Sequence, residues 1–151
     1  MSLIAETIKA TGQLNIKVTS PNGQVKENVV VPNMVVTAGK EWIAARMKDT
    51  GLPTQMTHMS IGSGTAIAAL TDETLGTELG RVSLTTAGGL VSGAVVTYDA
   101  TFGPGTGTGA ITEAGIFNGT PSGTMLCRTV FNVVNKGADD TLSITWTVTI
   151  S

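Results

Sequence analysis

Residues 142–150 (LSITWTVTI) alternate apolar and hydroxyl-bearing side chains without interruption. Alternation with a period of two puts each kind of side chain on its own face of a β-strand. The pattern therefore predicts a half-buried strand whose Trp146 faces the core together with Leu142, Ile144, Val148 and Ile150. Two more strands are expected just before it, over residues 110–117 and 124–131, around the turn-forming Asn118–Gly119 pair. We expect these strands to form the centre of a sheet that cannot fold without its last strand.

The remaining chain also has mostly strand character. Residues 13–31 predict a β-hairpin around the turn Pro21-Asn22-Gly23. A short strand is expected over residues 57–61, another over 81–86, and one long strand over 90–102. The long strand would place these side chains on one face: Val96, Tyr98, Ala100 and Phe102. About seven or eight strands without a βαβ alternation predict a mainly β fold, an antiparallel β-sandwich that is jelly-roll-like.

One segment, about residues 37–49, has a convincing helical pattern. Thr37 can cap the first turn, and Gly51 and Pro53 are typical of a helix end. The apolar side chains at helical spacing include Trp42. We interpret Trp42 as an anchor that holds the helix across one open end of the sheet, in preference to a ligand-stacking residue.

Length and charge restrict the class of protein. With 151 residues, the chain fits a single domain, predicted over residues 13–151 after an N-terminal arm over residues 1–12. Its net charge of −2 gives no basic surface for nucleic acid or an anionic membrane. Neither a signal peptide nor a membrane-spanning run is expected, and a single cysteine excludes an intramolecular disulfide.

Charged residues make up only 13% of the chain, against about 25% in ordinary soluble domains. Threonine and glycine take their place. Such a composition is typical either of a charge-poor β protein or of a subunit largely covered by neighbours in an assembly.

Two glycine-rich stretches could suggest phosphate binding. Residues 62–65 (GSGT) follow a strand, but no Lys-Ser or Lys-Thr pair completes a P-loop. Residues 103–109 lack the dinucleotide-binding spacing and precede a strand. We interpret both stretches as turns or loops.

The sequence also lacks a complete set of residues for nucleophilic catalysis. His58, the only histidine, has no serine in a G-x-S-x-G turn to activate, so we expect a structural or surface role. Cys127 has no second histidine to activate it and is expected to be a small buried apolar residue.

The carboxylates form no catalytic pair that the sequence can identify. They occur at Asp72-Glu73, Asp99, Glu113 and Asp139-Asp140. Calcium at the first or last of these pairs stays open as an alternative, although no EF-hand spacing supports it. Glu78 can pair with Arg81, and Glu113 can meet Arg128 across a hairpin, for about 0.2–1 kcal/mol. We therefore expect a protein that is not an enzyme, with no catalytic, cofactor-binding or metal-binding residues.

Several stretches together resemble small structural proteins of the virions of tailed bacteriophages. The residues that carry this resemblance are 36–44 (VTAGKEWIA), 59–65 (MSIGSGT), 71–81 (TDETLGTELGR), 113–117 (EAGIF) and 142–150. The resemblance covers about residues 34–151, and its motifs are structural, so it carries over no catalytic residue.

Within that group, the resemblance favours a capsid decoration (cement) protein. It implies a homo-oligomer, dimer or trimer, made in the host cytoplasm and bound at the capsid surface of the virion over junctions between major capsid proteins. The expected contact elements are residues 1–31 and the loops 62–80 and 103–109. A tail, baseplate or tail-fibre component, with tail or baseplate proteins as its partners, is the alternative. A small carbohydrate-binding module is a third hypothesis, which the few aromatic residues disfavour.

Overall fold

The computed structural model describes residues 6–48 and 50–151. One helix, α1 (Thr37–Arg46), follows the second strand. The strands are β1 (Ala10–Thr19), β2 (Val25–Val35), β3 (His58–Gly62), β4 (Glu78–Ser83), β5 (Leu90–Ser92), β6 (Val95–Phe102), β7 (Gly109–Phe117), β8 (Met125–Lys136) and β9 (Thr141–Ile150). The predicted mainly β, antiparallel character is confirmed.

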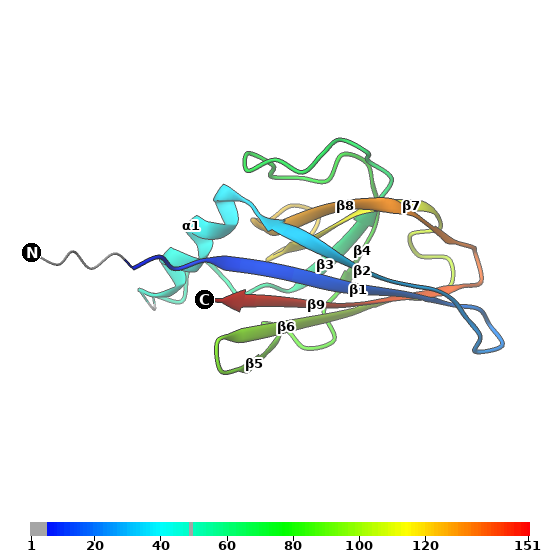
Figure 1. Cartoon of the computed structure of the whole chain (residues 1–151), viewed down its shortest axis with the longest axis horizontal. Coiled ribbons are helices and arrows are strands. Elements are labelled where there is room, and N and C mark those ends of the chain that lie inside the picture. The colour runs from blue at the N-terminus through cyan, green and yellow to red at the C-terminus, as the bar shows by residue number, and fades with distance from the viewer. Residues whose placement is uncertain (1–5, 49) are drawn as a thin grey trace, which may run out of the picture.

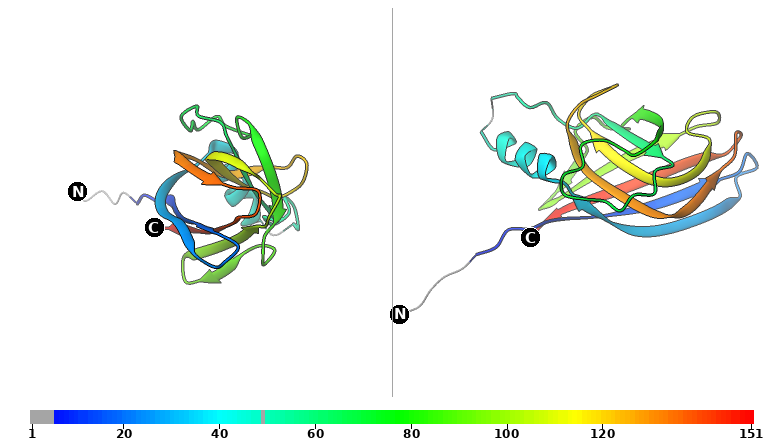
Figure 2. Two further views of the ribbon diagram at one scale, coloured as in Figure 1. Left: turned by 90° about the vertical axis from the view of Figure 1, so that its right-hand side faces the viewer. Right: turned by 90° about the horizontal axis from the view of Figure 1, so that it is seen from above.

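The strands form a single nine-stranded sheet in the order β4-β3-β7-β8-β2-β1-β9-β6-β5. This sheet curls around its own core as a half-barrel (Figure 2). The two parts of the sheet join at β2, whose first residues pair with β1 and whose Met34 and Val35 pair with β8. The predicted sandwich or jelly roll is not confirmed, because this junction makes the sheet continuous.

The C-terminal strands are interior strands of this sheet, but they are not all adjacent to one another. The predicted hairpin of β7 and β8 is confirmed, but β9 does not continue it. Instead, β9 pairs with β1 along one edge and with β6 along the other (Figure 1). Trp146 is fully buried, as predicted, and its indole Nε1 donates a hydrogen bond to Asn33 Oδ1 at 3.1 Å. Ile150, predicted to lie in the core, is instead 36% exposed because it reaches the rim of the half-barrel.

The predicted long strand over residues 90–102 is wrong. The chain reverses after Ser92, so that β5 and β6 form a hairpin in which Val91 pairs with Val96. Gly93 adopts φ = +58°, which a glycine takes at the first position of a tight hairpin turn without steric cost. Apolar residues continue on both sides of the turn, which explains why their pattern gave no sign of a break. The predicted shared face of Tyr98, Ala100 and Phe102 is confirmed, since all three are buried.

Helix α1 is shorter than predicted and is capped differently. It ends at Arg46 instead of residue 49, and Asp49 lies outside the described residues. Val36 is the N-cap residue, and no side chain caps the helix. The Thr37 backbone N–H donates to the Leu70 carbonyl at 2.8 Å, so a neighbouring loop satisfies a donor that a capping side chain would otherwise take.

Close packing against β8 fixes the position of α1. A Cβ atom on Gly39 would lie 2.0 Å from the carbonyl oxygen of Leu126. Only glycine therefore allows the helix backbone to approach this strand. As a result, α1 lies beside one end of the half-barrel, the end from which residues 6–9 also leave the sheet (Figure 1).

The predicted division into an arm over residues 1–12 and a domain over 13–151 stays a prediction. In the structure, β1 begins at Ala10, and Lys9 already exchanges backbone hydrogen bonds with Ser151 at 2.7 and 2.8 Å. Residues 1–5 lie outside the described part of the chain.

Candidate functional site

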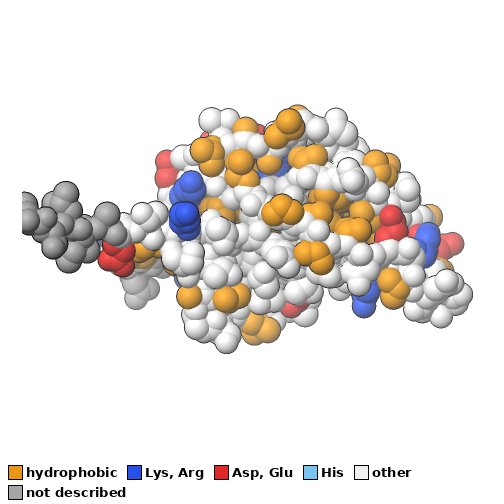
Figure 3. Space-filling model, viewed as in Figure 1, with side chains coloured by type: hydrophobic (Ala, Val, Ile, Leu, Met, Phe, Trp, Pro, Cys, Tyr) orange, Lys and Arg blue, Asp and Glu red, His pale blue; other side chains and the backbone are white. Residues whose placement is uncertain are grey.

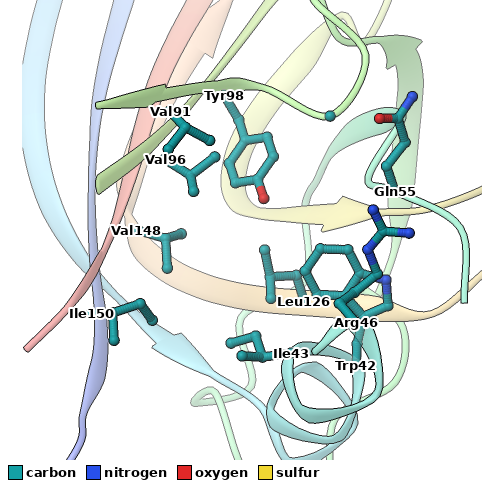
Figure 4. Close-up of a pocket in the computed structure, with 11 residues that line it drawn as sticks. Trp42, Ile43, Arg46, Gln55, Val91, Val96, Tyr98, Leu126, Val148 and Ile150 are labelled. Carbon is teal, nitrogen blue, oxygen red and sulfur yellow. The ribbon is translucent and has the colours of Figure 1, made fainter. Parts of the chain in front are cut away.

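An apolar pocket of about 270 Å³ opens between α1 and the ends of the strands at one end of the half-barrel (Figure 4). Its walls come from α1, β5, β6, β8 and β9, and from the loops that carry Gln55 and Gly88. The lining side chains are mostly aliphatic or aromatic: Trp42, Ile43, Val91, Val96, Tyr98, Leu126, Val148 and Ile150. Residues that are far apart in the sequence thus converge on one hollow because the sheet curls.

A second apolar hollow, of about 690 Å³, adjoins the pocket at the root of the arm. It shares Ile43 and Ile150 with the pocket, and Ile8 and Met47 also line it. We call the pocket and this hollow together the mouth groove. Three of the apolar side chains that line the groove are strongly exposed: Ile8 (74%), Val91 (72%) and Met47 (83%).

Trp42 makes the anchoring contacts expected from the sequence and also lines the pocket. It packs against the core, as its predicted anchoring role requires, and its indole Nε1 donates to the Thr54 carbonyl at 2.8 Å. It also forms part of the pocket wall, where the Arg46 guanidinium lies 6.0 Å from its ring centroid (Figure 4). The wall of the pocket is therefore held rigidly by the fold.

Few polar groups reach the pocket. Burial raises the pKa of Tyr98 well above its ordinary value, with a smaller contribution from Cys127, so the phenol remains neutral. Arg46 and Gln55 supply the other polar side chains. The lining of the pocket is thus mainly apolar, which makes the pocket suited to binding apolar side chains.

Glu113 and Arg128, predicted as a simple cross-strand pair, form the centre of a buried network. Their side chains meet at 3.0 Å, and both are almost completely buried. The Glu113 carboxylate also accepts hydrogen bonds from the backbone N–H groups of Gly64 at 2.6 Å, Gly76 at 2.8 Å and Thr77 at 2.8 Å. The 62–65 turn does bind an anion, but the anion is a carboxylate of the chain itself.

Arg128 connects this network to two further residues of the loop between β3 and β4. It forms an ion pair with Asp72 at 2.8 Å and donates to the Ala66 carbonyl at 3.1 Å. Burial raises the pKa of Glu113, but the hydrogen bonds from Thr77, Gly76, Arg128 and Gly64 outweigh it and lower the pKa overall. The loop between β3 and β4 is therefore fixed by buried charge.

His58 and Cys127 have surroundings that fit structural roles. The His58 ring lies 2.8 Å from Thr57 Oγ1 and 3.5 Å from Ser83 Oγ, and burial, with the nearby Arg81 charge, lowers its pKa. Cys127 is fully buried, and burial raises the pKa of its thiol far above the usual value. A thiol that stays protonated is a poor nucleophile.

Among the other carboxylates named from the sequence, those of Asp72, Glu78 and Asp140 bind cations or backbone amides of the chain. Asp72 accepts from the Ala69 backbone N–H, in addition to its ion pair with Arg128. Asp140 pairs with Lys26 at 2.6 Å and accepts from the Gly137 N–H at 2.7 Å. The predicted pair of Glu78 and Arg81 is present at 2.7 Å. Within residues 6–48 and 50–151, no three His, Cys, Asp or Glu side chains are grouped as a metal site would require.

Comparisons with protein-family models, curated proteins and solved structures gave no match. Among the described helical residues, none forms a segment with the length and apolar character needed to cross a membrane.

The mouth groove was not predicted from the sequence. Trp42 was predicted to anchor the helix across one open end of the sheet, and Tyr98 and Val148 were assigned to buried strand faces, but nothing in their spacing shows that the three line one hollow. The turn after Ser92, which brings Val91 to the pocket, was itself not predicted, so the sequence carried no clear signal for the groove.

Proposed function

We propose that this protein is a non-enzymatic structural protein of the virion of a tailed bacteriophage, and that it acts as a capsid decoration protein. In this role it binds as a homo-oligomer over junctions between major capsid proteins and stabilises the head. The mainly β, antiparallel fold is compatible with such a role.

The charge-poor surface is the observation that carries the proposal. The chain has only 9 basic and 11 acidic residues, and four of these side chains are buried: Glu113, Arg128, Lys136 and Asp140. Figure 3 shows one face on which apolar side chains are spread among neutral polar ones, with few charges. A surface of this kind supports contact with neighbouring subunits better than free existence in solution.

The contacts of the buried charged residues also support a structural role. Its charged residues are used to hold loops and strand ends: Glu113 and Arg128 fix the 62–80 loop, and Lys136 Nζ donates to the Gly103 carbonyl at 2.9 Å beside the 103–109 loop. A rigid loop that presents Ile67, 89% exposed, is suited to docking on a protein surface.

Cryo-electron microscopy of virions from the phage that encodes this chain tests the proposal. We expect density for the chain on the outer surface of the head. Density confined to the tail or baseplate would refute the decoration role and support the alternative assignment.

The copy number in purified virions gives an independent measurement. A decoration protein is expected in amounts comparable to the major capsid protein on a stained gel. A far smaller amount would indicate a component of the tail tip or fibre.

A further inference from the structure

We propose that the pocket of the mouth groove binds an aliphatic carboxylate of the fatty-acid class, with the carboxylate held by Tyr98 and Arg46. Sites for small molecules are typically concave and mostly apolar, with a few polar groups that fix the orientation of the ligand. The pocket is built in this way, because Arg46, Gln55 and Tyr98 bring polar groups to a mostly apolar lining.

The Tyr98 hydroxyl is the observation that points to a polar ligand group. Tyr98 is only 3% exposed, and its hydroxyl points into the pocket (Figure 4). Within residues 6–48 and 50–151 this hydroxyl forms no hydrogen bond, although the hydroxyl of a buried tyrosine usually has a partner. Burial raises the pKa of Tyr98 well above its ordinary value, so the hydroxyl keeps the proton that it donates to a ligand.

The Arg46 guanidinium supplies the positive charge that a carboxylate requires. It lies 6.0 Å from the centroid of the Trp42 ring, and its Nη1 donates to the Pro53 carbonyl at 3.1 Å. A guanidinium has five N–H donors, so this one bond does not exhaust them. Arg46 and Tyr98 line the same pocket (Figure 4), so a carboxylate seated between them accepts hydrogen bonds from both.

The rest of the groove fits a hydrocarbon chain. Figure 4 shows aliphatic side chains gathered on the side of the pocket away from Arg46: Val91, Val96, Val148 and Ile150. The groove continues past Ile43 and Ile150 into the second hollow, of about 690 Å³. A linear chain can follow this path, whereas a single aromatic ring would occupy only the pocket. The shape of the groove therefore favours an aliphatic carboxylate over an aromatic one.

Isothermal titration calorimetry of the full-length chain, freed of lipid, with decanoate tests the proposal. We expect one site per chain. Binding should tighten by about fourfold for each methylene added from octanoate to dodecanoate, because each methylene removed from water contributes a similar free energy. Decylamine, which has a similar chain and a cationic head, should bind about tenfold more weakly or worse. No binding of decanoate, or equal binding of decanoate and decylamine, would overturn the proposal.

Two substitutions test the residues that hold the carboxylate. Tyr98→Phe removes only the hydroxyl, and Arg46→Gln removes the charge of an exposed side chain. Each should weaken the binding of decanoate by about tenfold, because each removes a hydrogen bond to a charged group. The matched control is Lys17→Gln, which removes an exposed positive charge that lines neither part of the groove and should leave binding unchanged. Equal effects of Arg46→Gln and Lys17→Gln would refute the assigned role of Arg46 and, with it, the proposal.

Thermal unfolding of the Tyr98→Phe chain shows whether the hydroxyl is used within the fold. Because it forms no hydrogen bond among the described residues, the midpoint without ligand should be no lower than that of the wild type. The rise in midpoint on adding decanoate should be smaller than in the wild type. A midpoint well below that of the wild type without ligand would mean that the hydroxyl has a partner in the chain, which overturns the proposal.

A substitution in the apolar wall tests the position of the hydrocarbon chain. Val91 is 72% exposed in the pocket wall, and Val91→Glu should weaken the binding of decanoate by about tenfold or more. Val133, which is 50% exposed on β8, lines neither part of the groove, so Val133→Glu should leave binding unchanged. Equal effects of the two substitutions would overturn the proposal. None of these outcomes depends on the virion role, so failure of one proposal leaves the other standing.

Discussion

Glu113 makes many more contacts in the structure than its position on a hairpin predicts. The spacing of Glu113 and Arg128 on a hairpin predicted a pair worth about 0.2–1 kcal/mol. In the structure, backbone N–H groups of Gly64, Gly76 and Thr77 also point at the carboxylate. Breaking a buried, hydrogen-bonded ion pair of this kind costs several times more than losing a surface pair.

Replacing Glu113 by glutamine tests this role. The amide keeps the size of the side chain but brings its own N–H donors against backbone donors, and it removes the charge that faces Arg128. We expect Glu113→Gln to lower the free energy of unfolding in urea by about 3 kcal/mol. Glu78→Gln, which disrupts the more exposed pair with Arg81, should cost no more than about 1 kcal/mol. Similar losses in the two variants would contradict the buried network.

The same carboxylate makes stability depend on pH. Because the pKa of Glu113 is lower in the folded chain than its ordinary value of 4.5, its contribution is fully present above that value. The contribution is lost as the pH falls below 4.5 and through the pKa of the folded state. We therefore expect the difference in unfolding free energy between the wild type and Glu113→Gln to shrink in acid.

Urea unfolding of both proteins from neutral pH down to the acid range measures this difference. Asp140 also has a lowered pKa, because of hydrogen bonds from Lys26 and Gly137, and contributes to acid sensitivity in both proteins. Subtracting the two curves isolates Glu113. A difference that stays constant across the range would show that the carboxylate gains nothing from ionisation.

At the scale of elements, most strands were predicted well from the sequence, because the alternation of apolar and polar side chains indicates which face of a strand is buried. β1, β3, β7, β8 and β9 all follow predicted runs. The errors fall where a contact from elsewhere in the chain, or a turn within an apolar run, decides the structure. The carbonyl of Leu70 replaces the predicted Thr37 cap, and Gly93 reverses a run that otherwise continues as a strand.

Gly39 provides a test in which helix propensity and packing disagree. Alanine in the middle of a helix is favoured over glycine by about 1 kcal/mol. At this position, however, its Cβ would lie 2.0 Å from the Leu126 carbonyl oxygen, which belongs to the backbone of β8. We expect Gly39→Ala to lower the midpoint of thermal unfolding, because α1 must move away from the sheet. A raised midpoint would show that the helix is not held by this close contact.

At the scale of the whole molecule, the order of the strands could not be predicted from the sequence. Alternation along β9 shows that one face is buried, but it does not identify which strands lie beside it. The same is true of the mouth groove, which exists only because the curled sheet brings α1, β5, β6 and β9 to one opening. Predictions of the candidate site were therefore limited to the separate residues that form it.

The position of β9 between β1 and β6 makes the C-terminal strand a requirement for the fold, whereas residues 6–8 precede the first strand. Ten residues of β9 pair along β1, from Ala10 with Ile150 to Thr19 with Thr141. Deleting residues 142–151 removes nearly all of the strand that joins β1 to β6, and it exposes the core around Ile16 and Phe102 to water. We therefore expect the shortened chain to show no cooperative unfolding transition. Deleting residues 1–8 leaves the described strand pairs intact, because β1 begins at Ala10, so the circular dichroism spectrum and unfolding midpoint should match those of the full chain. A loss of cooperative unfolding in the shorter N-terminal deletion would mean that the arm belongs to the fold of its own chain.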